Sequence, residues 1–204
     1  MNYTHIVFDV DGTLLDTEKT GMVSLQQTVR KLLGREMSLE ELYPYFGIPI
    51  WEAVIRLGFE DPHNAAEVWE HHFQELLHLT VPFPGIEETL EALHKNGIVM
   101  GVVTSRNRAE FESDTYLARW KHFFSVTVCA EDSPAHKPAP DPMLTFLSRS
   151  GADPAGVLFV GDTFYDQQCA HAAGTSFALA TWGSRNGKDI PAEHYLNHPT
   201  DLIN

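Results

Sequence analysis

One pair of aspartates has the spacing expected of a catalytic or metal-binding pair. Asp9 and Asp11 follow the short apolar run Ile6 to Phe8, at the end of a predicted strand from Ile6 to Val10, and Gly12 follows at once. Side chains two residues apart in a β-strand point to the same side, so we expect both carboxylates to face one site. Two acids that close repel each other unless a cation or a proton lies between them. The spacing therefore predicts a charged site at the end of the first strand.

Polar residues of a consistent kind also follow three later apolar runs of the chain. In open parallel sheets, ligands bind just outside the carboxyl ends of the strands, so residues at these positions are expected to converge. With the first pair, they make up the predicted site: Asp9, Asp11, Thr104, Ser105, Lys137, Asp162 and Asp166.

The charge of this predicted site indicates what it must hold. Four aspartates against one lysine, four negative charges and one positive, leave a net charge near −3 if all are ionised. Such a cluster repels itself without a bound cation. Carboxylates without Cys or His indicate a hard ion, and Mg²⁺ fits best because it needs few protein ligands and shares its coordination shell with phosphate. A hydroxyl, an ammonium and Mg²⁺ around a carboxylate form a set suited to phosphoryl transfer.

The elements that position these residues alternate in the second part of the chain. Short, largely apolar runs with strand character at 98–103, 124–129, 157–160 and 176–180 are separated by helical patterns. This alternation is typical of a parallel sheet that is covered by helices on both faces. The sequence therefore predicts an α/β fold with a Rossmann-like, doubly wound parallel sheet. The pattern also predicts a helix from Ile86 to Lys95 that ends at Asn96-Gly97, and one helix from about Arg106 to Leu117. It assigns no element in detail after Trp182.

A helical block interrupts this core after its first strand. Apolar residues from Met22 to Leu33 recur at helix spacing, Ser38 to Glu41 has the pattern of a capping box, and Asp61-Pro62 begins a helix to about Leu79. The stiff segment Val81 to Gly85 is expected to lead back to the core. The predicted domains are an α/β core, residues 1–15 and 81–204, and an inserted all-α helical cap, residues 16–80.

Composition limits the partners and the compartment. The formal net charge of −14 argues against nucleic acid or an anionic membrane, because either partner requires a basic patch. Cys129 and Cys169 form no CxxC pair and fit a reducing compartment. The first residues lack a signal-peptide pattern, and no apolar window reaches the roughly 18 residues of a membrane span. We therefore expect a soluble, cytoplasmic protein.

Four segments, in order, resemble the motifs of the haloacid dehalogenase superfamily. They are Asp9 to Thr13, Val103 to Ser105, Lys137 to Asp141, and Gly161 to Asp166. With a helical insertion between the first two motifs, the chain is most similar to the phosphoglycolate phosphatase and β-phosphoglucomutase-like branch. The resemblance covers essentially the whole chain. Four motifs in order with suitable spacing are far more specific than the first motif alone.

The resemblance implies a Mg²⁺-dependent phosphatase that works through an aspartyl-phosphate. It makes Asp9 the nucleophile, while Asp11 protonates the leaving group, then activates water, and places its backbone carbonyl on the metal. The true dehalogenases lack an acid at the position of Asp11, so its presence favours phosphate chemistry. The cap is expected to close over the substrate and to supply contacts to the leaving group.

The resemblance also assigns the binding residues. Thr104, with Ser105 beside it, and Lys137 are expected to hold the phosphoryl oxygens. Asp162 is expected to bind Mg²⁺, and Asp166 to be a direct or indirect partner of the metal.

Two other functions remain open from the sequence. A β-phosphoglucomutase-like phosphomutase would share every core residue, and a non-catalytic phosphate-binding or signalling relative would share the fold. The substrate is expected to be a small phosphorylated metabolite, and phosphoglycolate, a sugar phosphate, a nucleotide and pyrophosphate all remain candidates. The sequence gives no indication of the oligomeric state.

Overall fold

The computed structural model describes residues 3–45, 50–185 and 187–203. The chain divides into two compact units, one formed by Met1–Leu15 and Pro82–Asn204 and the other by Asp16–Val81. The chain passes from one unit to the other through β2 (Leu15–Asp16) and β3 (Val81–Pro82), which pair in a two-stranded ribbon.

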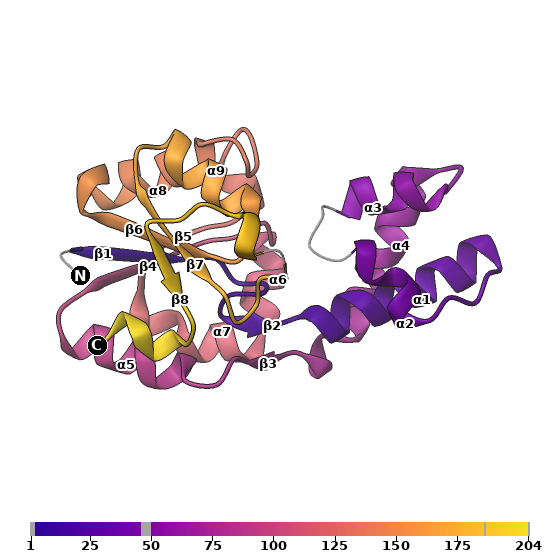
Figure 1. Ribbon diagram of the computed structural model, residues 1–204, viewed down its shortest axis with the longest axis horizontal. Coiled ribbons are helices and arrows are strands. Elements are labelled where there is room, and N and C mark those ends of the chain that lie inside the picture. The colour runs from indigo at the N-terminus through magenta and orange to yellow at the C-terminus, as the bar shows by residue number, and fades with distance from the viewer. Residues whose placement is uncertain (1–2, 46–49, 186, 204) are drawn as a thin grey trace. The chain divides into compact units, whose positions relative to one another are not determined.

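The first unit is built on a six-stranded sheet in the order β5-β4-β1-β6-β7-β8 (Figure 1). Every neighbouring pair is parallel. The strands are β1 (His5–Phe8), β4 (Val99–Val103), β5 (Phe124–Val128), β6 (Val157–Gly161), β7 (Ser176–Ala180) and β8 (His194–Leu196). The strand order reverses between β1 and β6, as in a doubly wound Rossmann-like sheet, and ligands bind at such a reversal. The predicted fold class is confirmed.

Helices cover both faces of this sheet (Figure 1). Ile6 and Phe8 of β1 belong to the hydrophobic core on the face with Trp120, whereas Val7 belongs to the core on the face with Phe146. Alternate strand residues point to opposite faces, so a strand buried on both sides must be apolar throughout. The helices are α5 (Ile86–Lys95), α6 (Arg108–Ser113), α7 (Thr115–Trp120), α8 (Asp141–Ser150) and α9 (Phe164–Ala172).

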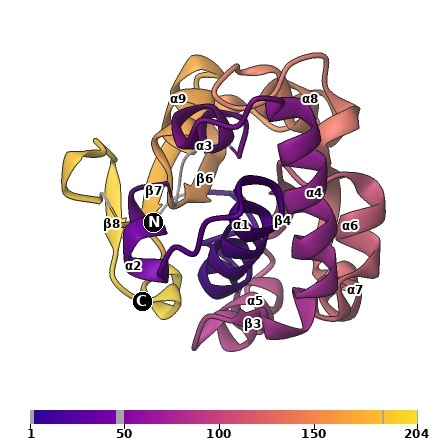
Figure 2. The ribbon, with the colours of Figure 1, turned by 90° about the vertical axis from the view of Figure 1, so that its right-hand side faces the viewer.

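The second unit is helical, and its described residues between 17 and 80 contain no strand (Figure 2). Its core joins Met22 and Val29 of the first helix to Val54 of the third. Ser38 forms the predicted capping box, and the Asp61 carboxylate accepts hydrogen bonds from the first turn of the last helix. The helices are α1 (Glu18–Leu33), α2 (Leu39–Leu42), α3 (Ile50–Leu57) and α4 (Pro62–Glu75).

Short 3-10 helices complete the two units. They are Tyr43–Tyr45, Leu77–Leu79, Lys121–Phe123, Ala130–Asp132, Pro154–Gly156, Gly187–Asp189 and Pro199–Leu202. Within the described ranges, every helix is too short or too polar to cross a membrane.

The structure corrects the prediction of one helix from Arg106 to Leu117. Two helices, α6 and α7, occupy the segment, and the chain is extended at Asp114 between them, with ψ of 124°. The Asp114 carboxylate accepts hydrogen bonds from the backbone N–H of Tyr116 at 2.9 Å and Leu117 at 3.1 Å. Asp114 is therefore the N-cap of a new helix. Arg106 lies before α6, in the loop that follows β4.

Candidate active site

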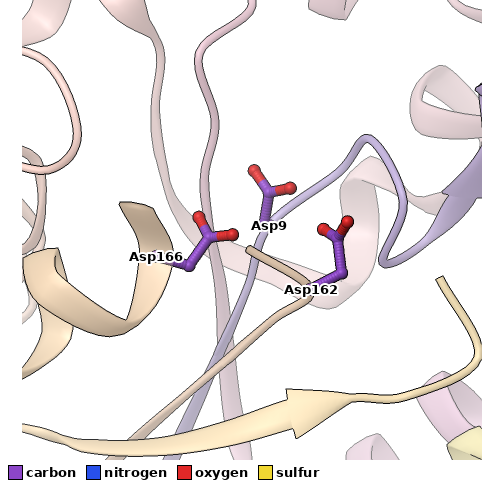
Figure 3. A group of neighbouring side chains, drawn as sticks. All are labelled: Asp9, Asp162 and Asp166. Carbon is purple, nitrogen blue, oxygen red and sulfur yellow. The ribbon is translucent and has the colours of Figure 1, made fainter. Parts of the chain in front are cut away.

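Three aspartates meet at the carboxyl edge of the two central strands (Figure 3). β1 and β6 are paired in register, Phe8 opposite Val160, and the Asp9 backbone N–H donates to the Val160 carbonyl at 2.9 Å. This register brings Asp9 beside Asp162, which follows β6. Asp166 comes from the first turn of α9. Carboxylate oxygens of Asp9, Asp162 and Asp166 lie within 4.8 Å of one another, and all three residues are buried.

Lys137 supplies the positive charge within this cluster. Its Nζ donates to Asp9 Oδ1 and to Asp166 Oδ1, both at 2.6 Å, and its side chain is 7% exposed. Three carboxylates around one ammonium still leave an excess of negative charge in a buried place, which is costly without a further cation. The oxygen-only donor set fits a hard divalent ion such as Mg²⁺.

Burial shifts the protonation of these groups. The pKa of Asp9 is raised to about 7, chiefly by burial and also by the Asp166 and Asp11 carboxylates, while Lys137 opposes the rise. Burial, with Asp166 and Asp9, also raises the pKa of Asp162 well above its ordinary value. Burial alone would lower the pKa of Lys137, but the carboxylates of Asp166 and Asp9 outweigh it and raise that pKa. The lysine therefore stays charged, while protons and a metal ion compete for Asp9 and Asp162.

Mg²⁺ is expected to bind more tightly as the pH rises from about 6 to about 8. Because the raised pKa values of Asp9 and Asp162 leave these carboxyls partly protonated at low pH, the metal must displace protons there. Titration calorimetry at several pH values, in buffers with different ionisation enthalpies, measures both the affinity and the number of protons released. An affinity that is flat across this range, with no proton release, would contradict the raised pKa values.

Asp11 occupies a different environment from Asp9. Its carboxylate is outside the three-aspartate cluster and accepts hydrogen bonds from Arg106, from Nη2 to Oδ1 at 2.7 Å and from Nε to Oδ2 at 3.0 Å. The Arg106 side chain is 4% exposed, whereas that of Asp11 is 36% exposed. The backbone carbonyl of Asp11, rather than its carboxylate, is expected to bind the metal, and this stays a prediction.

Arg106 was not among the predicted site residues. The sequence pattern assigned it only to the start of a helix, although an arginine two residues after Thr104 at a strand end was the available signal. The carboxylates of Asp11 and Asp114, together with the hydrogen bonds to them, outweigh the effect of burial and raise the pKa of Arg106. The guanidinium is therefore a fixed positive charge at this side of the site.

Thr104 and Ser105 follow β4, which is paired with β1. Thr104 is buried, and its Oγ1 accepts a hydrogen bond from the Arg106 backbone N–H at 3.1 Å. Because a hydroxyl is both donor and acceptor, its hydrogen remains available for a ligand oxygen. Ser105 is exposed. The structure therefore gives Thr104, rather than Ser105, the more fixed position.

The loop after β1 packs closely against Asp162. Thr13 Oγ1 donates to Asp162 Oδ1 at 3.1 Å, and Gly12 has φ of +82°, a conformation that disfavours any side chain. A Cβ atom on Gly12 would lie 2.3 Å from Asp162 Oδ2. From the other side, Trp182 Nε1 donates to the Thr13 carbonyl at 2.9 Å. The position of the Asp162 carboxylate therefore depends on this loop.

Gly12→Ala is expected to weaken Mg²⁺ binding as well as to lower the free energy of unfolding. The positive φ alone costs about 1–3 kcal/mol for a residue with a Cβ, and the new methyl group must push the Asp162 carboxylate aside. Gly97→Ala is the matched control, because Gly97 has φ of +75° and nothing within 4 Å of its Cβ position. Denaturant unfolding and Mg²⁺ titration should show a stability loss in both variants but an affinity loss only in Gly12→Ala. Equal Mg²⁺ affinity in the two variants would contradict this placement of Asp162.

Comparison with known proteins agrees with this architecture. Residues 6–180 match the sequence model of the haloacid dehalogenase-like hydrolase family. The chain is 33% identical to a phosphoglycolate phosphatase from Aquifex aeolicus, over 97% of this chain and 94% of that protein. It is 28% identical to pyrophosphatase PpaX from Bacillus velezensis, over 98% of this chain and 94% of that one.

A crystal structure shows the same likeness in three dimensions. It is that of a candidate phosphoglycolate phosphatase from Lactobacillus plantarum, with a TM-score of 0.91 and 29% identity, covering 100% of this chain and 99% of that one. The resemblance drawn from the four motifs is confirmed. The chain therefore belongs to the haloacid dehalogenase-like hydrolase family.

Proposed function

We propose that this protein is a Mg²⁺-dependent phosphatase that hydrolyses a small phosphorylated metabolite through an aspartyl-phosphate on Asp9. The observation that carries the proposal is the buried Asp9 carboxylate, held by Lys137 at the carboxyl edge of β1 and beside Asp162 and Asp166. The relatives named above as phosphatases support the reaction type. We also propose that the helical unit Asp16–Val81 is the cap that selects the substrate.

Asp9, Asp162 and Asp166 are the residues that would hold Mg²⁺. When bound, the ion supplies positive charge that offsets the charge of the transferring phosphoryl group. Lys137 adds a second positive charge from the protein itself, and the Thr104 hydroxyl offers a hydrogen bond to a phosphoryl oxygen. These groups are fixed before the substrate arrives, so little reorganisation is needed during the reaction.

In the first half of the proposed reaction, a carboxylate oxygen of Asp9 bonds to phosphorus. The bond from phosphorus to the leaving oxygen breaks, and Asp11 gives its proton to that oxygen, so the leaving group departs as an alcohol. In the second half, Asp11 takes a proton from water while the water oxygen bonds to phosphorus. The bond between Asp9 and phosphorus breaks, which releases inorganic phosphate and restores both aspartates.

A panel of phosphorylated metabolites tests the proposal. Phosphate release would be measured from phosphoglycolate, pyrophosphate, a sugar phosphate and a nucleoside monophosphate, with Mg²⁺ and with EDTA. We expect release from at least one compound that requires Mg²⁺. Folded, Mg²⁺-binding protein that releases no phosphate from any of them would contradict the proposal. Transfer from a sugar bisphosphate to a sugar phosphate, without free phosphate, would instead identify a phosphomutase.

A further inference from the structure

A buried arginine joins the two aspartates Asp11 and Asp114, which are far apart in the sequence. The Arg106 guanidinium donates through Nη2 to Asp11 Oδ1 at 2.7 Å and through Nη1 to Asp114 Oδ2 at 3.0 Å. Arg106 and Asp114 are almost fully buried, with side chains 4% and 5% exposed. The Asp11 side chain, in contrast, is 36% exposed. The buried arginine therefore holds Asp11 while part of the Asp11 side chain stays exposed.

The two oxygens of Asp11 are held unequally. Oδ1 accepts from Nη2 at 2.7 Å and from Nε at 3.2 Å, whereas among the described residues the single donor to Oδ2 is Nε, at 3.0 Å. A carboxyl group that carries a proton on Oδ2 can keep its hydrogen bond through Oδ1. The arginine can therefore hold Asp11 in one orientation both before and after a proton leaves it.

Arg106 is itself fixed at the backbone and at the far side of its guanidinium. Its N–H donates to Thr104 Oγ1 at 3.1 Å, and its carbonyl accepts from the Ala130 N–H at 2.9 Å. Asp114, its second carboxylate partner, is held by the first N–H groups of α7. An arginine with so many fixed partners has little conformational freedom left to lose when it orients another group.

We propose that Arg106 is a positioning residue that holds the Asp11 carboxyl group, through Oδ1, for proton transfer from Oδ2 to the leaving oxygen of the substrate. This inference rests on the proposed phosphatase function and adds a residue to it. The simpler alternative is an ion pair that only stabilises the fold. The positioning role and the structural role predict different results when Arg106 is replaced. Only the positioning role makes the loss of activity depend on the leaving group of the substrate.

Leaving-group chemistry separates the two roles. An alkoxide is a poor leaving group and needs a proton as the bond to phosphorus breaks, whereas p-nitrophenolate departs without one. The value of kcat/KM reports the steps up to this bond cleavage. A residue that positions the proton donor is therefore important for an alkyl phosphate and unimportant for p-nitrophenyl phosphate. A purely structural residue affects both substrates alike.

The experiment measures kcat/KM for both substrate types in the wild type, Asp11→Asn, Arg106→Met and the double variant. The alkyl phosphate is the best one found in the metabolite panel. We expect Arg106→Met to lower kcat/KM for it about 10²-fold and to change that for p-nitrophenyl phosphate less than about threefold. In the Asp11→Asn background, Arg106→Met should not change the ratio of kcat/KM for the alkyl phosphate to kcat/KM for p-nitrophenyl phosphate. The carboxyl group that Arg106 positions is already absent from that variant.

Two more variants keep the test independent of folding. Arg106→Met leaves Asp114 buried without its counter-charge, so Arg106→Met/Asp114→Asn removes both charges and keeps a side-chain oxygen to cap α7. It should show the same dependence on the leaving group. Arg119→Met is the matched control, because Arg119 lies on α7 but is exposed and pairs with Glu87; it should equal the wild type.

Equal losses on both substrates, or an undiminished loss in the Asp11→Asn background, would overturn the positioning role while leaving the phosphatase intact. Absence of Mg²⁺-dependent turnover in the wild type would instead overturn the proposed function. The two failures are therefore distinguishable in one set of assays.

Discussion

Asp9→Asn is expected to lower Mg²⁺-dependent phosphate release about 10⁴-fold or more. An amide has the shape of the carboxylate but no charge, and it cannot attack phosphorus as a nucleophile. The substitution also replaces one of the three carboxylates proposed to hold the metal with a neutral amide, which is a weaker ligand. The measurement is steady-state phosphate release on the best substrate of the panel, at saturating Mg²⁺ so that weaker metal binding does not account for the loss.

Unfolding is not expected to explain that loss. Because burial raises the pKa of Asp9, the charged form is costly to the folded state, and a neutral amide removes this cost. Metal-free Asp9→Asn should therefore be at least as stable as the wild type at about pH 8. Asp189→Asn, at an exposed position of the same unit, is the control and should keep full activity. Turnover that survives Asp9→Asn unchanged would refute the nucleophile.

Lys137→Met is expected to lower both stability and activity. It leaves Asp9, Asp162 and Asp166 buried together without an internal positive charge, and removing one partner of a buried ion pair costs about 3–5 kcal/mol. Turnover should fall about 10²-fold or more, because the ammonium that would stabilise the charge of the phosphoryl group is lost. Denaturant unfolding at about pH 8, with and without Mg²⁺, measures the first effect, and kcat measures the second.

The response to Mg²⁺ distinguishes this account from a general packing defect. Since Mg²⁺ restores positive charge among the three carboxylates, it should recover more stability in Lys137→Met than in the wild type. Lys95→Met, at an exposed position at the end of α5, is the matched control and should change neither quantity measurably. A Lys137→Met protein as stable as the wild type without Mg²⁺ would contradict the charge balance inferred for this cluster.

Local patterns were sufficient to predict most elements of the fold. The predicted helix from Ile86 to Lys95 and the predicted strand from Ser176 to Ala180 agree with the structure at both ends. Helix periodicity and the Asn96-Gly97 stop are properties of neighbouring residues, and so are short apolar runs. The fold class followed because such runs alternate with helices.

Elements that depend on distant partners were harder to predict. β8, His194–Leu196, has only three residues and no apolar run, and it forms because β7 offers a free edge. The break at Asp114 is similar, since an aspartate in a helical pattern is unremarkable in the sequence. The Asp114 carboxylate caps α7 and also accepts a hydrogen bond from Arg106. The contact between Asp114 and Arg106 is evident only in the folded chain.

The site shows the same division between local and distant information. The two-residue spacing of Asp9 and Asp11 placed both at one edge of the sheet. It did not show that their carboxylates have different partners, Lys137 for Asp9 and Arg106 for Asp11. Lys137 lies in the loop after β5, and Arg106 lies in the loop after β4. The residues around Asp9 and Asp11 do not indicate which of these side chains approaches which aspartate.

Detection of the phosphoenzyme tests the central claim most directly. Asp11→Asn should form the intermediate from p-nitrophenyl phosphate but hydrolyse it slowly, because water activation is impaired. After an acid quench, mass spectrometry of the peptides should find a phosphoryl group on Asp9, dependent on Mg²⁺, removed by hydroxylamine and absent from Asp9→Asn/Asp11→Asn. Phosphate release by the wild type, with no phosphoryl group on Asp9 under any of these conditions, would contradict the account.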